Sequence, residues 1–249
     1  ALGGRTVDWP YRRLTVPLAR FAAQHIGRLG TPLKRYHIAT VWRGENTQRG
    51  RYREFMQCDF DIIGTRALAA DIETALVIHD LLSALGFSKF SIRLNNRRGL
   101  NGFLELLGLA DRSTAVLRAL DKLAKAGPEH VVAEMTETAG ATQQQAEEIL
   151  QLGKISGGNQ QVLAEAKQML RGNQQGLAGI EQLEQMLAAL GAAGVPEARV
   201  GIDLSIARGL DYYTGTVYET YLDDLPGIGS VCSGGRYDNL AEIFTDVQL

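Results

Sequence analysis

The spacing of apolar residues predicts helices and strands in turn along the first part of the chain. Apolar positions recur at helical spacing in 14–29 and in 67–85, and Gly86 follows the second run, where glycine is common just past a helix end. Segments 34–43 and 52–63 alternate between apolar and polar residues instead, which predicts two strands. The sequence "GENTQRGR" between them predicts a hairpin with a charged tip.

The second of these strands carries unusual chemistry on one face. Its even-numbered positions are largely apolar, whereas its odd-numbered positions include an aromatic ring, an amide and two carboxylates. The odd-numbered residues are Arg53, Phe55, Gln57, Asp59 and Asp61. Successive residues of a strand point to opposite faces, so these groups share one face. This pattern favours a ligand-binding surface.

The pattern changes again in the rest of the chain. A strand at 90–96 and a short helix at 97–108 precede a stretch from about 113 to 194 that is rich in Ala, Leu, Gln and Glu and is broken by Gly. This stretch predicts an all-helical insertion. Its expected helices are 113–126, 128–138, 142–152, 159–171 and 177–190. Strands then resume at 198–207, 213–222 and 228–234, with a last helix near 237–244.

These elements predict an α+β fold in which an antiparallel sheet is flanked by helices and interrupted by the helical insertion. The hairpin-like connections at 44–51 and 223–227 favour antiparallel pairing. The expected division of the chain has a first core part at 1–112, which includes the hairpin, the insertion at 113–194, and a second core part at 195–249.

Charge is nearly balanced over the whole chain but not within it. The 249 residues carry a formal net charge of −2, so the molecule as a whole does not attract nucleic acid electrostatically. Between Arg12 and Arg66, however, eleven Lys and Arg stand against four Asp and Glu, which suits a phosphate-bearing ligand. The alternative is an ordinary solvated basic surface. Four basic residues of the insertion also fall at helical spacing, and a solvated helix face is the preferred interpretation of that stripe. They are Arg112, Arg118, Lys122 and Lys125.

Other features narrow the class of protein. Cys58 and Cys232 have no disulfide pattern and are expected to be reduced, buried thiols, and the four histidines show no metal-ligand spacing, so no structural metal is expected. No segment has the length of a membrane span or the plan of a signal peptide, which predicts a cytoplasmic protein without a membrane partner. The chain also has no obvious cap at either end and is expected to be part of a longer protein.

Three segments concentrate arginine, tyrosine and glycine at strand ends. They are the hairpin, "RGLDYYTGTVYE" (208–219) and "SGGRYDNL" (233–240). Arg43 and Arg51 flank the hairpin tip and could hold a polyphosphate from two sides. Taken singly, each feature has a structural explanation: Phe55 could be core, and the paired tyrosines and glycines could be packing and a turn. The combination favours a ligand site.

The hairpin "WRGENTQRGRYREFMQCDFDIIG" resembles motif 2 of the class II aminoacyl-tRNA synthetases in its histidyl form. The segments at 208–219 and 233–240 resemble the two histidine signatures of the histidyl-tRNA synthetase family. The helical insertion between them also matches that family, as do "RLNNRRGLNGFLELLGLAD" and "AVLRALDKL". The resemblance covers nearly the whole chain and implies a class II synthetase-like antiparallel sheet.

The resemblance implies a role for each matching residue. In the ATP site, Arg43 would contact the α-phosphate, Glu45 the adenine amino group and Arg51 the outer phosphates, with Phe55 stacked on the adenine. Arg208 would act with Arg43 in catalysis by stabilising charge on the α-phosphate. The residues expected to bind histidine are Thr15, Gln57, Asp61, Tyr212, Tyr213 and Tyr237.

The reaction that the resemblance implies joins histidine to ATP, with Mg²⁺, to give histidyl-adenylate and pyrophosphate, and then transfers histidine to tRNA(His). The full-length protein would be a homodimer. Two positions depart from the family pattern. Arg13 stands where the family has an acidic residue that binds the α-ammonium group, and Asp61 stands where some members have Glu. Motif 1, motif 3 and the anticodon-binding domain have no match, so a partial catalytic domain is expected.

Two alternatives remain open at this stage. The first is a histidine-binding paralogue that acts as regulatory subunit of ATP phosphoribosyltransferase and does not charge tRNA. The second is the degenerate synthetase-like domain of a stress kinase that senses uncharged tRNA. The nearly complete hairpin, with Arg43, and the presence of Arg208 favour the enzyme over both.

Overall fold

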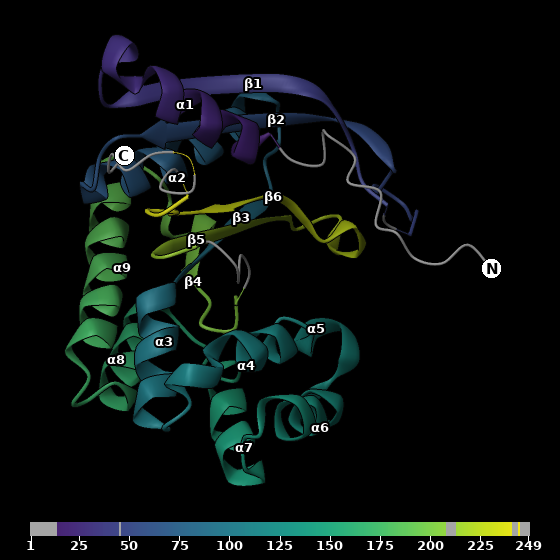
Figure 1. The fold of residues 1–249 in the computed structure, drawn as a ribbon, viewed down its shortest axis with the longest axis vertical. Helices are drawn as coiled ribbons and strands as arrows, with labels where there is room; N and C mark the ends of the chain where they lie inside the picture. The colour runs from purple at the N-terminus through teal and green to yellow at the C-terminus, as the bar shows by residue number, and fades with distance from the viewer. Residues whose placement is uncertain (1–13, 45, 208–212, 241–243, 245–249) are drawn as a thin grey trace. The chain divides into compact units, whose positions relative to one another are not determined.

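The computed structural model describes residues 14–44, 46–207, 213–240 and 244, without the side chains of 124 and 125. Figure 1 shows the course of the chain, which divides into two compact units. The first comprises Ala1–Arg66 with Asp238–Leu249, and the second comprises Ala67–Tyr237.

The first unit contains one helix and the expected hairpin. Helix α1 (Thr15–Leu29) precedes the antiparallel strands β1 (Leu33–Trp42) and β2 (Glu54–Ile63). Beyond the paired strands, the backbones of Gln48 and Arg51 exchange two hydrogen bonds of 3.2 and 2.9 Å. These bonds close a tight turn at the hairpin tip.

The small core of this unit lies between α1 and one end of the hairpin. Leu18 and Ala22 on the helix pack with Ile63 at the end of β2, and Leu33 at the start of β1 adjoins them. Helical spacing places Leu18 and Ala22 on the same side of α1, which explains why this face is buried.

The second unit is built on a four-stranded sheet. Its strands are β3 (Phe90–Asn96), β4 (Val200–Ile202), β5 (Thr216–Leu222) and β6 (Ser230–Gly235). Their order in the sheet is β4-β3-β5-β6, and β5 pairs antiparallel with both neighbours. The predicted α+β class is confirmed. The pair β3–β4 is parallel, because the whole helical segment connects these two strands as a crossover.

Two helices cover one face of this sheet. Helices α2 (Leu68–Ala84) and α9 (Gln174–Ala192) pack against each other and against β3. Even-numbered side chains of β5 reach both helices, since the hydroxyl of Tyr218 contacts α2 and that of Thr216 contacts α9. Strand β5 is therefore buried along most of its length.

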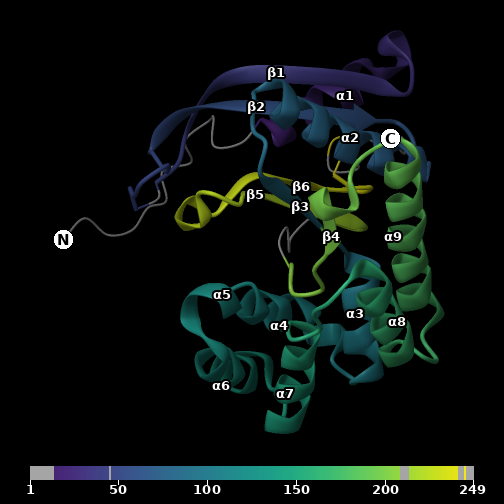
Figure 2. The same cartoon turned by 180° about the vertical axis from the view of Figure 1, so that it is seen from behind.

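Residues 97–169 form a run of helices. They are α3 (Arg97–Leu106), α4 (Ser113–Leu120), α5 (Leu123–Ala126), α6 (Pro128–Ala139), α7 (Gln143–Leu152) and α8 (Asn159–Met169). Helices α4 to α7 gather at one end of the unit, and Figure 2 shows the same group from behind. Two stop signals explain boundaries here: Gly140 ends α6 in the left-handed conformation, and Thr142 caps α7.

Some elements differ in extent from the sequence prediction. The strand expected at 198–207 is reduced to Val200–Ile202, because the Asp203 side chain accepts hydrogen bonds from Ser205 and forms a turn. The helix expected at 113–126 is broken between α4 and α5. In the segment 237–244, residues 238–240 form a turn, and 241–243 lie outside the described residues.

Candidate functional site

The paired strands of the hairpin bring the predicted site residues onto one face. The register places Arg35 opposite Asp61, Ala39 opposite Gln57 and Val41 opposite Phe55. Directly opposite residues of an antiparallel pair share a face, so the odd-numbered residues of both strands line the same surface. Pairing extends one step beyond β1, where the Arg43 backbone nitrogen donates to the carbonyl oxygen of Arg53 at 2.8 Å.

Three of the predicted site residues form one cluster near the tip of the hairpin. The guanidinium carbon of Arg43 lies 5.0 Å from the centroid of the Phe55 ring, which is a cation–π arrangement. Arg43 Nη2 also donates to Gln57 Oε1 at 2.7 Å. Gln57 Nε2 in turn donates to the Asp59 carboxylate. A fixed guanidinium beside an aromatic ring is suited to a ligand that carries both a phosphate and a flat base.

The last predicted residue of this face, Asp61, is held by a partner that the sequence analysis did not identify. Arg35 Nη2 lies 2.8 Å from Asp61 Oδ2, and the two side chains are only 15% and 9% exposed. This ion pair lies six residues along β2 from Phe55, toward the α1 end of the hairpin. The charge of Asp61 is therefore partly balanced within the hairpin itself.

The opposite face of the hairpin is exposed although it is the more apolar one. Tyr36 is 77% exposed, Ile38 54% and Met56 71%. Cys58 is exposed on the same face and Cys232 is half-buried, so the expectation of buried thiols is wrong. The polar face contains the more covered side chains, including Val41 and Ile63, which are buried. The alternation in the sequence identified the two faces, but it did not indicate which of them is covered.

The remaining predicted residues fall into two groups: those with a place in the fold and those outside the described residues. Thr15 is the first residue of α1, and Arg51 closes the turn at the hairpin tip. Glu45, Arg208 and Tyr212 lie outside the described residues, and so does Arg13.

In the second unit, the two histidine-signature segments meet at the ends of β5 and β6. The Thr214 backbone nitrogen donates to the Arg236 carbonyl at 2.8 Å, and the Arg236 backbone nitrogen donates to the Thr216 carbonyl at 2.8 Å. Tyr213 and Tyr237 are the residues directly next to this ladder. A Cβ atom at Gly235 would lie 2.8 Å from the Tyr213 ring, so the absence of a side chain at Gly235 allows this ring to lie close to the backbone.

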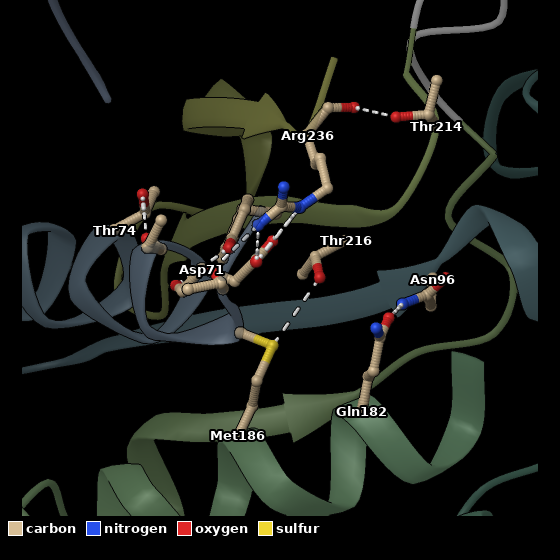
Figure 3. A network of polar contacts seen from close by, with 11 residues as sticks. Asp71, Thr74, Asn96, Gln182, Met186, Thr214, Thr216 and Arg236 are labelled. Atoms are coloured by element: carbon tan, nitrogen blue, oxygen red, sulfur yellow. Dashed lines mark hydrogen bonds and ion pairs between the residues drawn. The ribbon is translucent and has the colours of Figure 1, made fainter. Parts of the chain in front are cut away.

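An ion pair ties this ladder to helix α2 (Figure 3). Arg236 donates through Nε and Nη2 to both carboxylate oxygens of Asp71, at 2.5 to 3.2 Å. Asp71 is only 5% exposed, and the hydroxyl of Tyr218 donates to its backbone carbonyl oxygen at 2.9 Å. Burial raises the pKa of Tyr218 well above its ordinary value of 10.0, and the neighbouring Asp71 carboxylate adds to this effect.

The face of the sheet opposite α2 and α9 is polar. Glu219 is 3% exposed and accepts a hydrogen bond from the Tyr221 hydroxyl. Asn95 is 1% exposed, and its amide donates to the carbonyls of Leu204 and Ile206 at 3.1 and 2.9 Å. Asn95 therefore fixes the segment that leads into the first histidine signature.

The basic stripe of the helical insertion makes contacts within the protein. Arg112 donates to the carbonyl oxygen of Gly140 at 2.7 Å, and Lys122 pairs with Glu134 at 2.6 Å. Arg118 also has an interaction within the described part of the chain, and the side chain of Lys125 lies outside it. Arg112 thus supports the end of α6, where the last carbonyl groups of a helix attract cations.

The described residues contain neither a metal-binding cluster nor a membrane-spanning helix. No group of three or more His, Cys, Asp or Glu side chains there could hold a metal ion. No helix in that part of the chain combines the length and apolarity needed to cross a bilayer.

Four polar residues that make the contacts described above were not singled out from the sequence. They are Arg35 in the first unit and Asp71, Asn95 and Glu219 in the second. For Arg35 a signal was available, because continuing the hairpin register from its tip places this residue opposite Asp61. For Asp71, Asn95 and Glu219, no pattern in the sequence indicated a role. Asp71 is paired with a residue 165 positions away, and no local pattern connects the two.

Comparison with known proteins identifies the relatives of this chain. The family model described as histidyl-tRNA synthetase matches residues 13–248. The histidine–tRNA ligase of Rhodopirellula baltica is 58% identical over 99% of this chain and 56% of its own length. The chain thus spans about half the length of the curated relatives it matches.

Solved structures agree with this assignment. A histidyl-tRNA synthetase from Nostoc sp. PCC 7120 has a TM-score of 0.86 and 36% identity, covering 96% of this chain and 55% of that one. A Bacillus halodurans protein described as an ATP phosphoribosyltransferase regulatory subunit/histidyl-tRNA synthetase has a TM-score of 0.78 over 94% of this chain and 59% of that one. At 24% identity, the second likeness shows the fold alone.

Proposed function

The chain belongs to the histidyl-tRNA synthetase family, and from this membership we propose that it activates histidine with ATP and transfers it to tRNA(His). The observation that carries the proposal is the hairpin cluster, in which Arg43 is held by the Phe55 ring and by the Gln57 amide. A regulatory paralogue that binds histidine alone has no use for a guanidinium and a ring arranged for a nucleotide.

Each part of the hairpin has a proposed task in the first step. Arg43 neutralises charge on the α-phosphate and Phe55 stacks on the adenine, while Arg51 and Glu45 bind the outer phosphates and the adenine amino group. Magnesium enters with the nucleotide as the MgATP substrate. The arginine and aromatic groups of the cluster suit the phosphates and the base. Activation then depends on positioning and on charge neutralisation.

The histidine-binding task is proposed for six residues: Thr15, Gln57, Asp61, Tyr212, Tyr213 and Tyr237. Arg208 is proposed to stabilise charge on the α-phosphate as the carboxylate of histidine attacks. Arg13 replaces the acidic residue that serves the α-ammonium group in relatives, so we assign that task to Asp61. Homodimer formation is proposed for the full-length protein.

The experiment that tests this proposal is histidine-dependent exchange of pyrophosphate into ATP. It is run on this chain and on a hybrid in which residues 13–248 replace the matching part of the Rhodopirellula baltica ligase. Exchange by the hybrid supports the proposal, and exchange by both shows that the chain alone is sufficient. A hybrid that is folded but inactive contradicts it.

The second candidate is a histidine-binding regulatory subunit of ATP phosphoribosyltransferase. The likeness in fold to the Bacillus halodurans protein is the observation that favours it. It differs from the first candidate in one measurable respect: histidine binds, but neither the chain nor the hybrid catalyses exchange. Calorimetric titration of histidine beside the exchange assay therefore separates the two candidates.

A further inference from the structure

Arg236 is the residue at which the two histidine-signature segments are joined. Its backbone nitrogen donates to Thr216 and its carbonyl accepts from the backbone of Thr214, and the Thr214 hydroxyl also lies 3.4 Å from that carbonyl. Tyr213 precedes this ladder and Tyr237 follows it. Any shift of Arg236 along the strand direction therefore moves both tyrosines.

The side chain of Arg236 fixes that point to helix α2 (Figure 3). Two of its nitrogens contact the Asp71 carboxylate, and Nη2 also donates to the carbonyl of Ala67 at 3.1 Å. A planar guanidinium that binds a carboxylate through two nitrogens restricts the rotation of both partners. Asp71 lies in the first turn of α2, where the helix dipole favours a negative charge.

Two glycines leave room for this arrangement. A Cβ atom at Gly215 would lie 2.9 Å from Cδ of Arg236, and one at Gly235 would lie 2.8 Å from the Tyr213 ring. The neighbouring Gly234 differs, because a Cβ atom there would meet no atom within 4 Å. Of these three glycines, the two with close neighbours are therefore the ones that place Arg236 and Tyr213.

Stability alone does not explain a buried ion pair at this position. Desolvation offsets most of the attraction between two buried charges, and well-packed apolar residues often stabilise a fold equally well. The pair does fix the position of the Arg236 backbone, because it holds this residue at a set distance from α2.

We propose that Asp71 and Arg236 are positioning residues for histidine recognition, acting through Tyr213 and Tyr237. The ion pair holds the joined ends of the two signature segments, and the tyrosines on either side keep the orientation that the imidazole ring of the ligand requires. This inference rests on the proposed function for the identity of the ligand. The mechanical link between the ion pair and the ladder does not depend on it.

The test uses a double variant that removes both charges without leaving one of them buried, Asp71→Leu/Arg236→Met. Histidine affinity is measured by calorimetry on the 249-residue chain. We expect at least a tenfold loss in the double variant. Arg236→Lys retains the charge but not the two-nitrogen contact, and we expect an intermediate loss. The exposed pair of Lys89 and Asp224 in the same unit provides the control, and Lys89→Ala should bind histidine like the parent chain.

A second measurement follows the ladder directly. Hydrogen–deuterium exchange of the backbone amides of Thr214 and Arg236 should accelerate at least tenfold in both the double variant and Arg236→Lys. The amides of helix α7 should keep their rates. A variant that unfolded as a whole would accelerate exchange everywhere, so the restricted pattern separates positioning from simple destabilisation.

The outcomes distinguish the inference from the function on which it rests. If the parent chain and the hybrid ligase described above both fail to bind histidine, the proposed function fails, and the exchange of Thr214 and Arg236 still decides the link between ion pair and ladder. If the parent binds histidine and the double variant binds equally well, the inference is wrong. Unchanged exchange at Thr214 and Arg236 in folded Arg236→Lys also overturns it.

Discussion

The guanidinium of Arg43 lies over the ring of Phe55, with 5.0 Å between its central carbon and the ring centroid. Arg43 follows β1, whereas Phe55 belongs to β2. They share a face because Phe55 pairs with Val41, two residues before Arg43. The cation is thus placed beside the ring before any ligand is bound. A nucleotide that stacks on Phe55 would bring its phosphates toward a group already held in place.

Phe55→Leu tests this relationship in the hybrid ligase. Leucine retains an apolar side chain but offers no flat surface, and stacking of a base on an aromatic ring contributes about 1–3 kcal/mol. We expect the KM for ATP in pyrophosphate exchange to rise about tenfold or more. The matched control is Met56→Leu on the opposite face, which should leave that KM unchanged. Equal KM values for Phe55→Leu and the parent would contradict a stacking role.

Arg35 and Asp61 should be coupled energetically. Asp61→Asn leaves a largely buried guanidinium without its counter-charge, and we expect the free energy of unfolding to fall by about 2 kcal/mol. Arg35→Met should lower it as well. Urea denaturation of the parent, both single variants and the double variant gives the coupling energy, which we expect to exceed about 1 kcal/mol. Strict additivity of the two single effects would show that the pair does not interact.

Tyr218 should make stability fall at high pH. Because its pKa is raised in the folded chain, the unfolded chain loses the phenolic proton first as the pH passes 10. The full contribution is therefore present below pH 10, and it decreases by about 1.4 kcal/mol per pH unit until the folded pKa is reached. Tyr218→Phe removes this slope. Denaturation midpoints between pH 8 and 11 should converge for the two proteins, and parallel curves would refute the effect.

The two neighbouring glycines of the second signature should respond differently to alanine. At Gly235 the added methyl group meets the Tyr213 ring and the Thr216 carbonyl below 3.0 Å, so Gly235→Ala should destabilise the chain by about 1–3 kcal/mol. At Gly234 the space is open, and Gly234→Ala should be neutral within about 0.5 kcal/mol. Thermal unfolding of both variants measures the difference. A similar cost at both positions would mean that close packing at Gly235 is not the cause.

The exposed apolar face of the hairpin should promote self-association of the 249-residue chain. Apolar side chains that are grouped on a surface favour contacts with other molecules. Ile38→Thr/Met56→Thr replaces two exposed apolar groups. At each protein concentration, its sedimentation profile should contain more monomer than that of the parent chain. The polar face is unaltered in this variant. Unchanged profiles would show that this face does not drive association.

Local sequence patterns predicted most of the elements because their causes are local. The alternation in 52–63 arises from the two-residue period of a strand, and the helix stop at Gly140 arises from a backbone conformation that glycine adopts easily. The same alternation separated the chemical face of the hairpin from the apolar one. The alternation therefore grouped Phe55 with Gln57, and the position of Arg43 beside the hairpin tip indicated a phosphate contact. The structure shows that the three side chains lie together.

The sequence was sufficient to identify the family, the alternation of helices and strands, and the face of the hairpin that carries Phe55 and Gln57. Only the tertiary structure revealed that the apolar face of the hairpin is the exposed one and that Arg236 is anchored to Asp71 on α2. The physical reason is distance along the chain. Periodicity and turn chemistry depend on neighbouring residues, whereas burial and ion pairing depend on which distant segments pack together, and no local pattern encodes that choice.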